Sequence, residues 1–226
     1  MADQTGGLKR FYTLFAVVAI VGVGVIGYLM SQQKRVIIPV DVTVQASDTA
    51  GFHGYLLGSD SAPVEITEYA DYECPHCGQF AVVTFPDIKA RLIDTGKLRW
   101  RFRDFPLNGH TGSRVAAHSA ACASDQGKYW EQSARIFDGQ GSWALEPDPA
   151  DVLRGFARDN RLDLARYDAC MTSAKYAGRI QADYESGSRL GVNATPTFII
   201  GGKMYPGGLA ADDIKRLVDS LAQRPH

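Results

Sequence analysis

The longest apolar segment of the chain lies close to its N-terminus. Residues 11–30 (FYTLFAVVAIVGVGVIGYLM) carry no charge, and these twenty residues in an α-helix would rise about 30 Å, the thickness of the hydrocarbon core of a bilayer. A cleaved signal peptide is the alternative, but its apolar region usually has about 7 to 15 residues and ends at a small-residue cleavage site, which GYLMSQQ lacks. We therefore predict an uncleaved signal anchor, a single transmembrane helix, at 11–30, preceded by a cytoplasmic segment at 1–10.

Alternation of apolar and polar residues predicts the strands that follow. Residues 63–69 (PVEITEY) and 98–105 (LRWRFRDF) alternate with the period of two that is typical of β-strands. We expect the first of them at a buried edge of the sheet. Residues 197–200 and 203–205 are separated by two glycines, which predicts a β-hairpin.

A helical apolar spacing fills the region between the second strand and the hairpin. This spacing runs from 113 to 190 with breaks near 139–149 and near Asn160, so we expect four or five helices there. An amphipathic pattern at 212–223 predicts a closing helix. The order of strand, helix, strand, helical block, hairpin and helix predicts an α/β fold with an α-helical insertion at about 112–190.

The composition is that of an ordinary globular domain behind the predicted anchor. Residues 31–60 contain a short apolar patch and then small polar residues, which predicts a tether, and the rest of the 226-residue chain is long enough for a single core. The formal net charge is −1 and the basic residues are scattered. This excludes the charged surface that nucleic-acid-binding proteins need.

The segment with the clearest chemistry is Cys74-Pro75-His76-Cys77, which follows the first predicted strand. Two thiols at i and i+3 at a helix start are close enough to form a disulfide, and the free N–H groups of a helix start stabilise a thiolate. Pro75 suits the first helical turn, where a missing N–H costs nothing. We expect Cys74 to be the exposed, attacking sulfur, Cys77 to resolve the mixed disulfide, and the His76 side chain to favour the Cys74 thiolate.

Other uses of a C-x-x-C segment fit the sequence less well. Covalent haem attachment needs His directly after the second cysteine, where Gly78 stands. Structural zinc needs a second pair of ligands at short spacing, and the two remaining cysteines are far apart. We expect no cofactor. A metal-handling module with Cys74, His76 and Cys77 as soft ligands remains the alternative from another functional class.

Thr195-Pro196 stands immediately before the predicted hairpin. A cis bond at this position can bring the backbone beside the cysteine pair and leave its N–H and C=O groups free for an extended substrate. The dipeptide alone is a weak signal because most X-Pro bonds are trans.

Three segments together resemble the DsbA-like branch of the thioredoxin superfamily. They are EITEYADYECPHCGQF at 65–80, RDFPLNGH at 103–110 and RLGVNATPTFIIGGK at 189–203. The resemblance covers about 60–223. It implies a thioredoxin-like domain over 61–223 that contains an inserted α-helical domain. It also implies a catalytic CPHC pair and a cis-proline at Pro196 that faces this pair.

The resemblance also implies a role for Glu68. In this family an acid six residues before the first catalytic cysteine lies beneath the pair and relays the proton of the second one, here Cys77. Arg101 or Arg103, on the neighbouring strand, is a candidate counter-charge. The alternative is an ordinary strand carboxylate that faces solvent.

The remaining cysteines bear on the compartment. The resemblance implies that Cys122 and Cys170, in separate predicted helices, form a structural disulfide; two free buried thiols are the alternative. Stable disulfides belong to oxidising compartments. We therefore expect residues 31–226 on the extracytoplasmic, periplasmic side of the cell membrane.

The function that these expectations favour is thiol-disulfide exchange. We predict an enzyme that introduces disulfides into reduced exported proteins and is itself reoxidised by a quinone-linked membrane partner. A disulfide isomerase or reductase is the alternative, because Thr195 before the cis-proline, in place of valine, resembles isomerase relatives. Those relatives carry a separate dimerisation domain, for which the thirty residues at 31–60 are too few.

Overall fold

The computed structural model describes residues 5–31 and 42–223, and the chain divides into two units, Met1–Arg35 and Val36–His226. The first unit contains α1 (Thr5–Ser31), which includes the apolar segment 11–30. Among the described residues, no helix combines the length and apolar character needed to cross a membrane, so the anchor stays a prediction. Residues 1–4 of the predicted cytoplasmic segment and 32–41 of the predicted tether lie outside the described residues.

A five-stranded sheet with the order β1-β3-β2-β4-β5 forms the centre of the second unit. Its strands are β1 (Tyr55–Leu57), β2 (Val64–Ala70), β3 (Leu98–Asp104), β4 (Thr197–Ile200) and β5 (Lys203–Pro206). β2 and β3 run parallel, and the other neighbours are antiparallel. The prediction of an edge position for β2 is wrong, because β3 and β4 pair with both of its edges.

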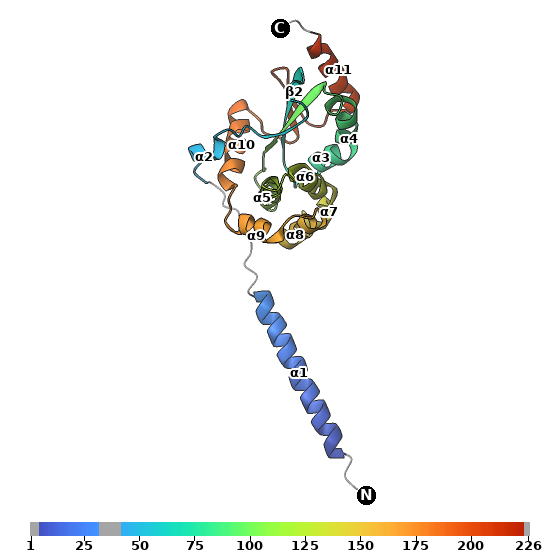
Figure 1. The fold of residues 1–226 in the computed structure, drawn as a ribbon, viewed down its shortest axis with the longest axis vertical. Coiled ribbons are helices and arrows are strands. Elements are labelled where there is room, and N and C mark those ends of the chain that lie inside the picture. Colours follow the sequence, from blue (N-terminus) through green and yellow to red (C-terminus); the bar gives the residue numbers. More distant parts are fainter. Residues whose placement is uncertain (1–4, 32–41, 224–226) are drawn as a thin grey trace. The chain divides into compact units, whose positions relative to one another are not determined.

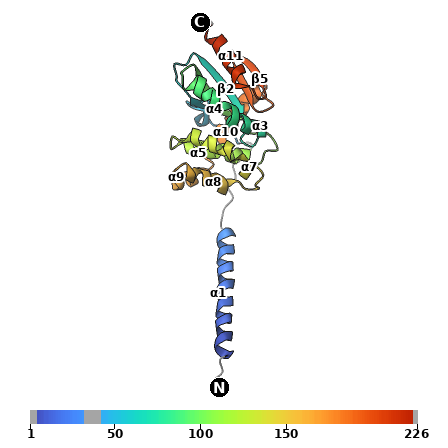
Figure 2. The same ribbon diagram turned by 90° about the vertical axis from the view of Figure 1, so that its right-hand side faces the viewer.

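One face of the sheet is covered by a long helical segment and the C-terminal helix (Figures 1 and 2). They are α3 (Pro75–Gln79), η1 (Phe80–Thr84), α4 (Phe85–Ile88), η2 (Lys89–Ile93) and α11 (Ala211–Ala222). η1 and η2 are π-helical turns, and Pro86 lies in α4 between them. Proline has no N–H to donate to the carbonyl four residues earlier, which favours a local change from α-helical to π-helical hydrogen bonding. Phe80 packs on Trp100 and Phe198 in this layer.

The other face is covered by α10 (Ala177–Leu190), as Figure 1 shows. Here Phe105 stacks on Tyr184 of the helix and meets Tyr69 of β2 edge-on. The helix approaches closely because Gly187 has no side chain: an added Cβ would lie 2.7 Å from a ring carbon of Phe105.

A helical insertion lies between β3 and the second half of the sheet. It comprises α5 (Ser113–Ser124), α6 (Tyr129–Asp138), α7 (Gln140–Trp143), α8 (Ala150–Asp159) and α9 (Leu164–Thr172), followed by α10. These described residues thus form six helices where four or five were expected, because the single turn α7 is too short to give a periodic pattern. The insertion has its own core around Trp143 and Leu153, and this core continues to Tyr72 and Phe102.

Two elements lie within the range that the sequence analysis assigned to a tether. They are α2 (Ala46–Thr49) and the edge strand β1, which pairs with β3. Tyr55 of β1 is buried and stacks on Tyr129 of the insertion. Neither element is predictable from the sequence pattern, because segments of three and four residues give no measurable periodicity.

Candidate active site

The CPHC segment begins helix α3 directly after the central strand, as the sequence predicts. Cys74 is the N-cap residue with an extended backbone (φ −68°, ψ 121°), and Pro75 occupies the first turn. Cys74 and Cys77 are free thiols. Both are buried, at 4% and 0% exposure, so the prediction that Cys74 is exposed is wrong.

The helix start stabilises the thiolate of Cys74. Its pKa falls from 9.0 to about 5, chiefly because Cys77 donates a hydrogen bond from its thiol. Hydrogen bonding to Thr195 and to the backbone N–H groups of Cys77 and His76 lowers the pKa further, whereas burial raises it. His76 therefore acts through its backbone, whereas the sequence analysis expected its side chain to do so. The His76 side chain is exposed.

Cys77 behaves in the opposite way. Burial, the hydrogen bond to Cys74 and the charge of Cys74 raise its pKa well above the ordinary value, and the charge of Glu68 adds to this effect. Cys77 therefore keeps its proton when Cys74 has lost its own. The two sulfurs are unequal in the sense that the sequence analysis predicted, although the difference lies in charge stabilisation more than in exposure.

The Thr195–Pro196 bond is cis, as predicted, and its backbone contacts the pair. The Cys74 thiol donates to the Thr195 carbonyl oxygen, with 3.4 Å between sulfur and oxygen. The segment is fixed on its other side, where the N–H of Gly207 donates to the Pro196 carbonyl oxygen at 2.8 Å. The backbone of residues 195 and 196 thus lies beside the sulfur that an incoming substrate must reach.

Glu68 is buried on the inner face of β2 and is not a solvent-facing carboxylate. Burial raises its pKa from 4.5 to about 8, against the opposing effect of a hydrogen bond from Trp100. The indole Nε1 of Trp100 donates to Glu68 Oε2 at 3.1 Å. Near pH 7 this carboxyl therefore holds a proton, and its charge when ionised acts on Cys77.

Neither arginine proposed as a counter-charge pairs with Glu68. Arg101 binds Glu65 (Nε to Oε1, 2.6 Å), and Arg103 binds Asp183 (Nε to Oδ1, 3.0 Å). The reason is the strand alternation itself: β2 and β3 are in register, so the arginines lie on the face opposite to Glu68. Trp100 lies on the same face as Glu68, so the partner of this carboxyl is a neutral hydrogen-bond donor and not a positive charge.

An apolar cavity of about 560 Å³ adjoins Glu68. It lies between the α3–η2 segment and α6, and its aromatic lining includes Phe80, Phe85, Trp130 and Phe137. Glu68 is thus enclosed by aromatic side chains, which explains why desolvation dominates its pKa.

Two residues outside the predicted catalytic set hold the segment before Cys74, and the sequence marked one of them, Asp71, only as a helix-start signal. Gln140 of α7 donates from Nε2 to the carbonyl oxygens of Tyr72 (2.7 Å) and Cys74 (3.0 Å). Asp71 accepts the N–H groups of Glu73 (2.8 Å) and Leu107 (2.7 Å). Gln140 lies in a predicted break between helices, where nothing in the spacing marks it.

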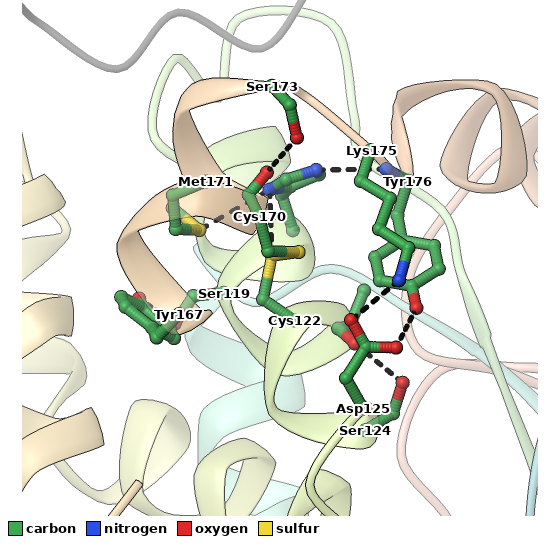
Figure 3. The surroundings of a disulfide bond; sticks show 12 residues. Ser119, Cys122, Ser124, Asp125, Tyr167, Cys170, Met171, Ser173, Lys175 and Tyr176 are labelled. Atoms are coloured by element: carbon green, nitrogen blue, oxygen red, sulfur yellow. Dashed lines mark hydrogen bonds and ion pairs between the residues drawn. A yellow bond between two sulfur atoms is a disulfide. The ribbon is translucent and has the colours of Figure 1, made fainter. Parts of the chain in front are cut away.

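Cys122 and Cys170 form a disulfide, as the family resemblance implies (Figure 3). It joins α5 to α9 inside the insertion, with 48 residues of sequence separation. The metal-handling alternative at the CPHC segment finds no support: in the described part of the chain a compact set of possible ligands occurs at this disulfide and His118, and Cys74, His76 and Cys77 form none.

Comparison with known proteins shows the family. The family model described as Thioredoxin matches residues 52–220. Disulfide bond formation protein D of Bacillus subtilis is 26% identical over 167 residues, which cover 73% of this chain and 75% of that protein. The crystal structure of alpha-DsbA1 of Wolbachia pipientis superposes with a TM-score of 0.67 at 28% identity, covering 74% of this chain and 89% of that one.

A second group of relatives is much longer than the chain. Na(+)/H(+) antiporter NhaA 3 of Salinispora tropica is 35% identical over 154 residues, which are 68% of this chain and 22% of the antiporter. The chain thus spans less than a quarter of the length of the two Salinispora antiporters, the second of which it matches over 24%.

Proposed function

The chain belongs to the thioredoxin family, and on that premise we propose that it is a DsbA-like disulfide oxidoreductase that oxidises cysteine pairs in exported proteins. One observation carries the proposal: the two thiols at the start of α3 have pKa values shifted in opposite directions, to about 5 for Cys74 and upward for Cys77. Such a pair exchanges disulfides through a defined order of sulfurs.

The exchange begins with the oxidised enzyme, in which Cys74 and Cys77 are joined. A client thiolate attacks Cys74 Sγ, a mixed disulfide forms between client and Cys74, and Cys77 leaves as a thiolate. The second client thiolate then attacks the client sulfur of the mixed disulfide. Cys74 leaves as a thiolate, the client gains its disulfide, and the enzyme gains two electrons.

Glu68 supplies the proton that this sequence needs. Cys77 leaves as a thiolate in a buried place where its pKa is raised, so it takes up a proton. Glu68, with a pKa of about 8, is protonated near pH 7 and can provide one. Because Cys74 has a pKa of about 5, it leaves as a thiolate and needs no proton.

The client binds along the cis-proline segment. The Thr195 carbonyl oxygen accepts the Cys74 thiol in the reduced enzyme, and it is available to an extended peptide backbone whenever Cys74 is in a disulfide with Cys77 or with the client. This places the client cysteine next to Cys74, the sulfur with which it reacts.

The low pKa of Cys74 also supports the oxidase direction. Stabilisation of its thiolate favours the reduced enzyme, which makes the disulfide a good acceptor of electrons. Equilibration of the purified protein with glutathione tests this direction. We expect a reduction potential well above that of thioredoxin, about −270 mV, whereas a value at or below it would identify a reductase.

The location and the reoxidation partner belong to the same proposal. α1 includes the uncharged segment 11–30, which supports a signal anchor with the catalytic domain on the extracytoplasmic side. Disulfide-forming chemistry and a structural disulfide suit an oxidising compartment. A quinone-linked membrane protein would then return the reduced pair to the disulfide.

A further inference from the structure

Sulfur and nitrogen donors gather around the Cys122–Cys170 disulfide in a way that a structural cross-link does not require. His118 and Cys122 lie four residues apart on one face of α5, and Cys170 and Met171 are neighbours on α9. Nδ1 of His118 lies 3.3 Å from Met171 Sδ and 3.5 Å from Cys122 Sγ. The donor atoms of His118, Cys122 and Cys170 all lie within 4.8 Å of one another.

This cluster is shielded from solvent. Its four side chains are exposed by 6% or less. Figure 3 shows Met171 and the two cysteines at the contact between α5 and α9, with Tyr176 beside them. Soft sulfur ligands in a dry, enclosed site favour a soft monovalent ion such as Cu(I) over Mg²⁺ or Ca²⁺.

The hydrogen bonds of His118 define its part in the cluster. The backbone N–H of Tyr176 donates to Nε2 at 3.0 Å, so Nε2 carries no proton, and in the neutral ring the proton is on Nδ1. Nδ1–H therefore points toward Cys122 and Met171 as a donor. His118 is thus placed to donate a hydrogen bond to a Cys122 thiolate that binds a metal ion. The ligands of that ion would then be the sulfur atoms of the cluster and not the His118 ring.

We propose that the reduced Cys122–Cys170 pair, together with Met171, forms a three-sulfur site for Cu(I), and that the disulfide closes this site. The protein then has a copper site that is available only in one redox state, on elements separate from the CPHC pair. His118 is a positioning residue that stabilises the Cys122 thiolate through its Nδ1–H.

The site opens when the Cys122–Cys170 disulfide is reduced by thiol-disulfide exchange with a small-molecule thiol of the glutathione class. One thiolate attacks Sγ of Cys170, the more exposed of the two cysteine residues, and Cys122 leaves as a thiolate. A second thiolate attacks the external sulfur of the mixed disulfide, releasing Cys170 and oxidised glutathione. Cu(I) then binds the two thiolates and the thioether without any change in its oxidation state.

The test uses the full-length chain carrying Cys74→Ser and Cys77→Ser, which removes the competing CPHC thiols. The protein is prepared with the second disulfide intact or reduced, and each form is titrated anaerobically with Cu(I) against bicinchoninate. We expect one tightly bound Cu(I) per reduced chain and none in the oxidised form. Copper X-ray absorption of the reduced complex should show sulfur neighbours alone.

Two methionine variants separate a three-sulfur site from a bare pair of thiolates. In the reduced protein Met171→Leu should weaken Cu(I) binding by about tenfold or more. Met204→Leu, on the exposed hairpin strand β5, is the matched control and should leave binding unchanged. His118→Gln should weaken binding without changing the sulfur-only absorption spectrum.

Several results would overturn the proposal. Equal copper binding by the oxidised and reduced forms would show that the disulfide does not control the site. Unchanged affinity in Met171→Leu would leave only two thiolates, and a nitrogen neighbour in the absorption spectrum would make His118 a ligand. A reduced chain that loses its far-ultraviolet helical signal, or that binds no copper, would equally rule out a preformed site.

Discussion

At the scale of single residues, the chemistry rests on the difference between two sulfurs one helical turn apart. Cys74, the N-cap, lies where backbone N–H groups have no helical partners, and it gains their hydrogen bonds when it ionises. Cys77 is one turn inside the helix and fully buried, so ionisation there is penalised by desolvation. Position within the first turn thus assigns the roles of the two residues.

The order of attack can be tested by trapping. Cys77→Ala removes the resolving thiol but keeps the stabilised Cys74 thiolate, so mixed disulfides with client proteins should accumulate and appear on non-reducing gels. Cys74→Ala should give none, because Cys77 is buried and its pKa is raised. Trapping by both variants, or through Cys77 alone, would reverse the assignment.

Replacement of Glu68 tests the proton transfer. Glu68→Gln should slow turnover by at least about tenfold, because the carboxyl no longer supplies a proton to Cys77. In the parent enzyme the rate should fall as the pH rises through about 8, where Glu68 loses its proton, and this fall should be absent in the variant. Glu65→Gln, on the opposite face of the same strand, is the control; a similar profile for both variants would argue against a role for Glu68.

The same substitution has a distinct effect on stability. The folded pKa of Glu68 is about 8 and the ordinary value is 4.5, so the folded chain binds more protons between these pH values. The free energy of unfolding of the parent should therefore fall as the pH rises from 4.5 to 8, by on the order of a few kcal/mol. Glu68→Gln should reduce this dependence, and the part that remains belongs to other buried carboxyls with raised pKa values, Asp183 and Asp104. Denaturant unfolding at pH 5 and pH 8 measures it, and an equal pH dependence in parent and variant would contradict the raised pKa of Glu68.

The residues that the sequence identified correctly are those with a local signature. Cys74 and Cys77 follow a strand at a fixed spacing, and Pro196 precedes a hairpin. Trp100 was missed as the partner of Glu68 because that contact depends on the register between two strands. Alternation alone, however, already places the arginines of β3 on the opposite face from Trp100.

At the scale of elements, the disulfide in the insertion joins two helices that also meet through side chains. Tyr167 of α9 donates to Ser119 of α5 at 2.7 Å, and Cys122 and Cys170 link the same two helices covalently. Elements of seven or more residues were predicted from their periodicity, and the four-residue strands β4 and β5 were predicted from the two glycines between them. β1, α2 and α7, at three or four residues each, were not, because they exist only through the partners on which they pack.

Removal of the α5–α9 cross-link should weaken the fold more than the catalysis. With a sequence separation of 48 between its cysteines, the disulfide contributes about 4 kcal/mol to the free energy of unfolding in the chain-entropy model. Cys122→Ala with Cys170→Ala should therefore lower the denaturation midpoint, while turnover by the CPHC pair stays close to that of the parent. Unfolding in urea and client oxidation measure the two effects; an equal loss of both would tie the insertion directly to catalysis.

At the scale of the whole molecule, the sheet and the insertion meet at the cysteine pair. Strand β2 delivers the CPHC segment, β4 follows the cis-proline segment, and Gln140 of the insertion fixes the backbone just before Cys74. The order of elements along the chain was enough to predict this two-part architecture. The contacts of Gln140 with Tyr72 and Cys74, which join the two parts, were not predictable, because their residues lie 68 and 66 positions apart in the sequence.

The last prediction concerns the side of the membrane on which this architecture works. If 11–30 is an anchor and the domain forms disulfides, the C-terminus must lie in an oxidising compartment, because cytosolic thiol systems keep cysteine pairs reduced. The lysines and arginines on the two sides of the segment are nearly balanced, Lys9 and Arg10 before it and Lys34 and Arg35 after it, so charge does not decide the orientation.

A C-terminal alkaline phosphatase fusion, which is active only after export, should be active, and a C-terminal fluorescent reporter that folds only in the cytoplasm should be dark. Deletion of 11–30 is the control and should reverse both signals. A bright cytoplasmic reporter on the intact chain would place the cysteine pair in a reducing environment and favour the reductase alternative.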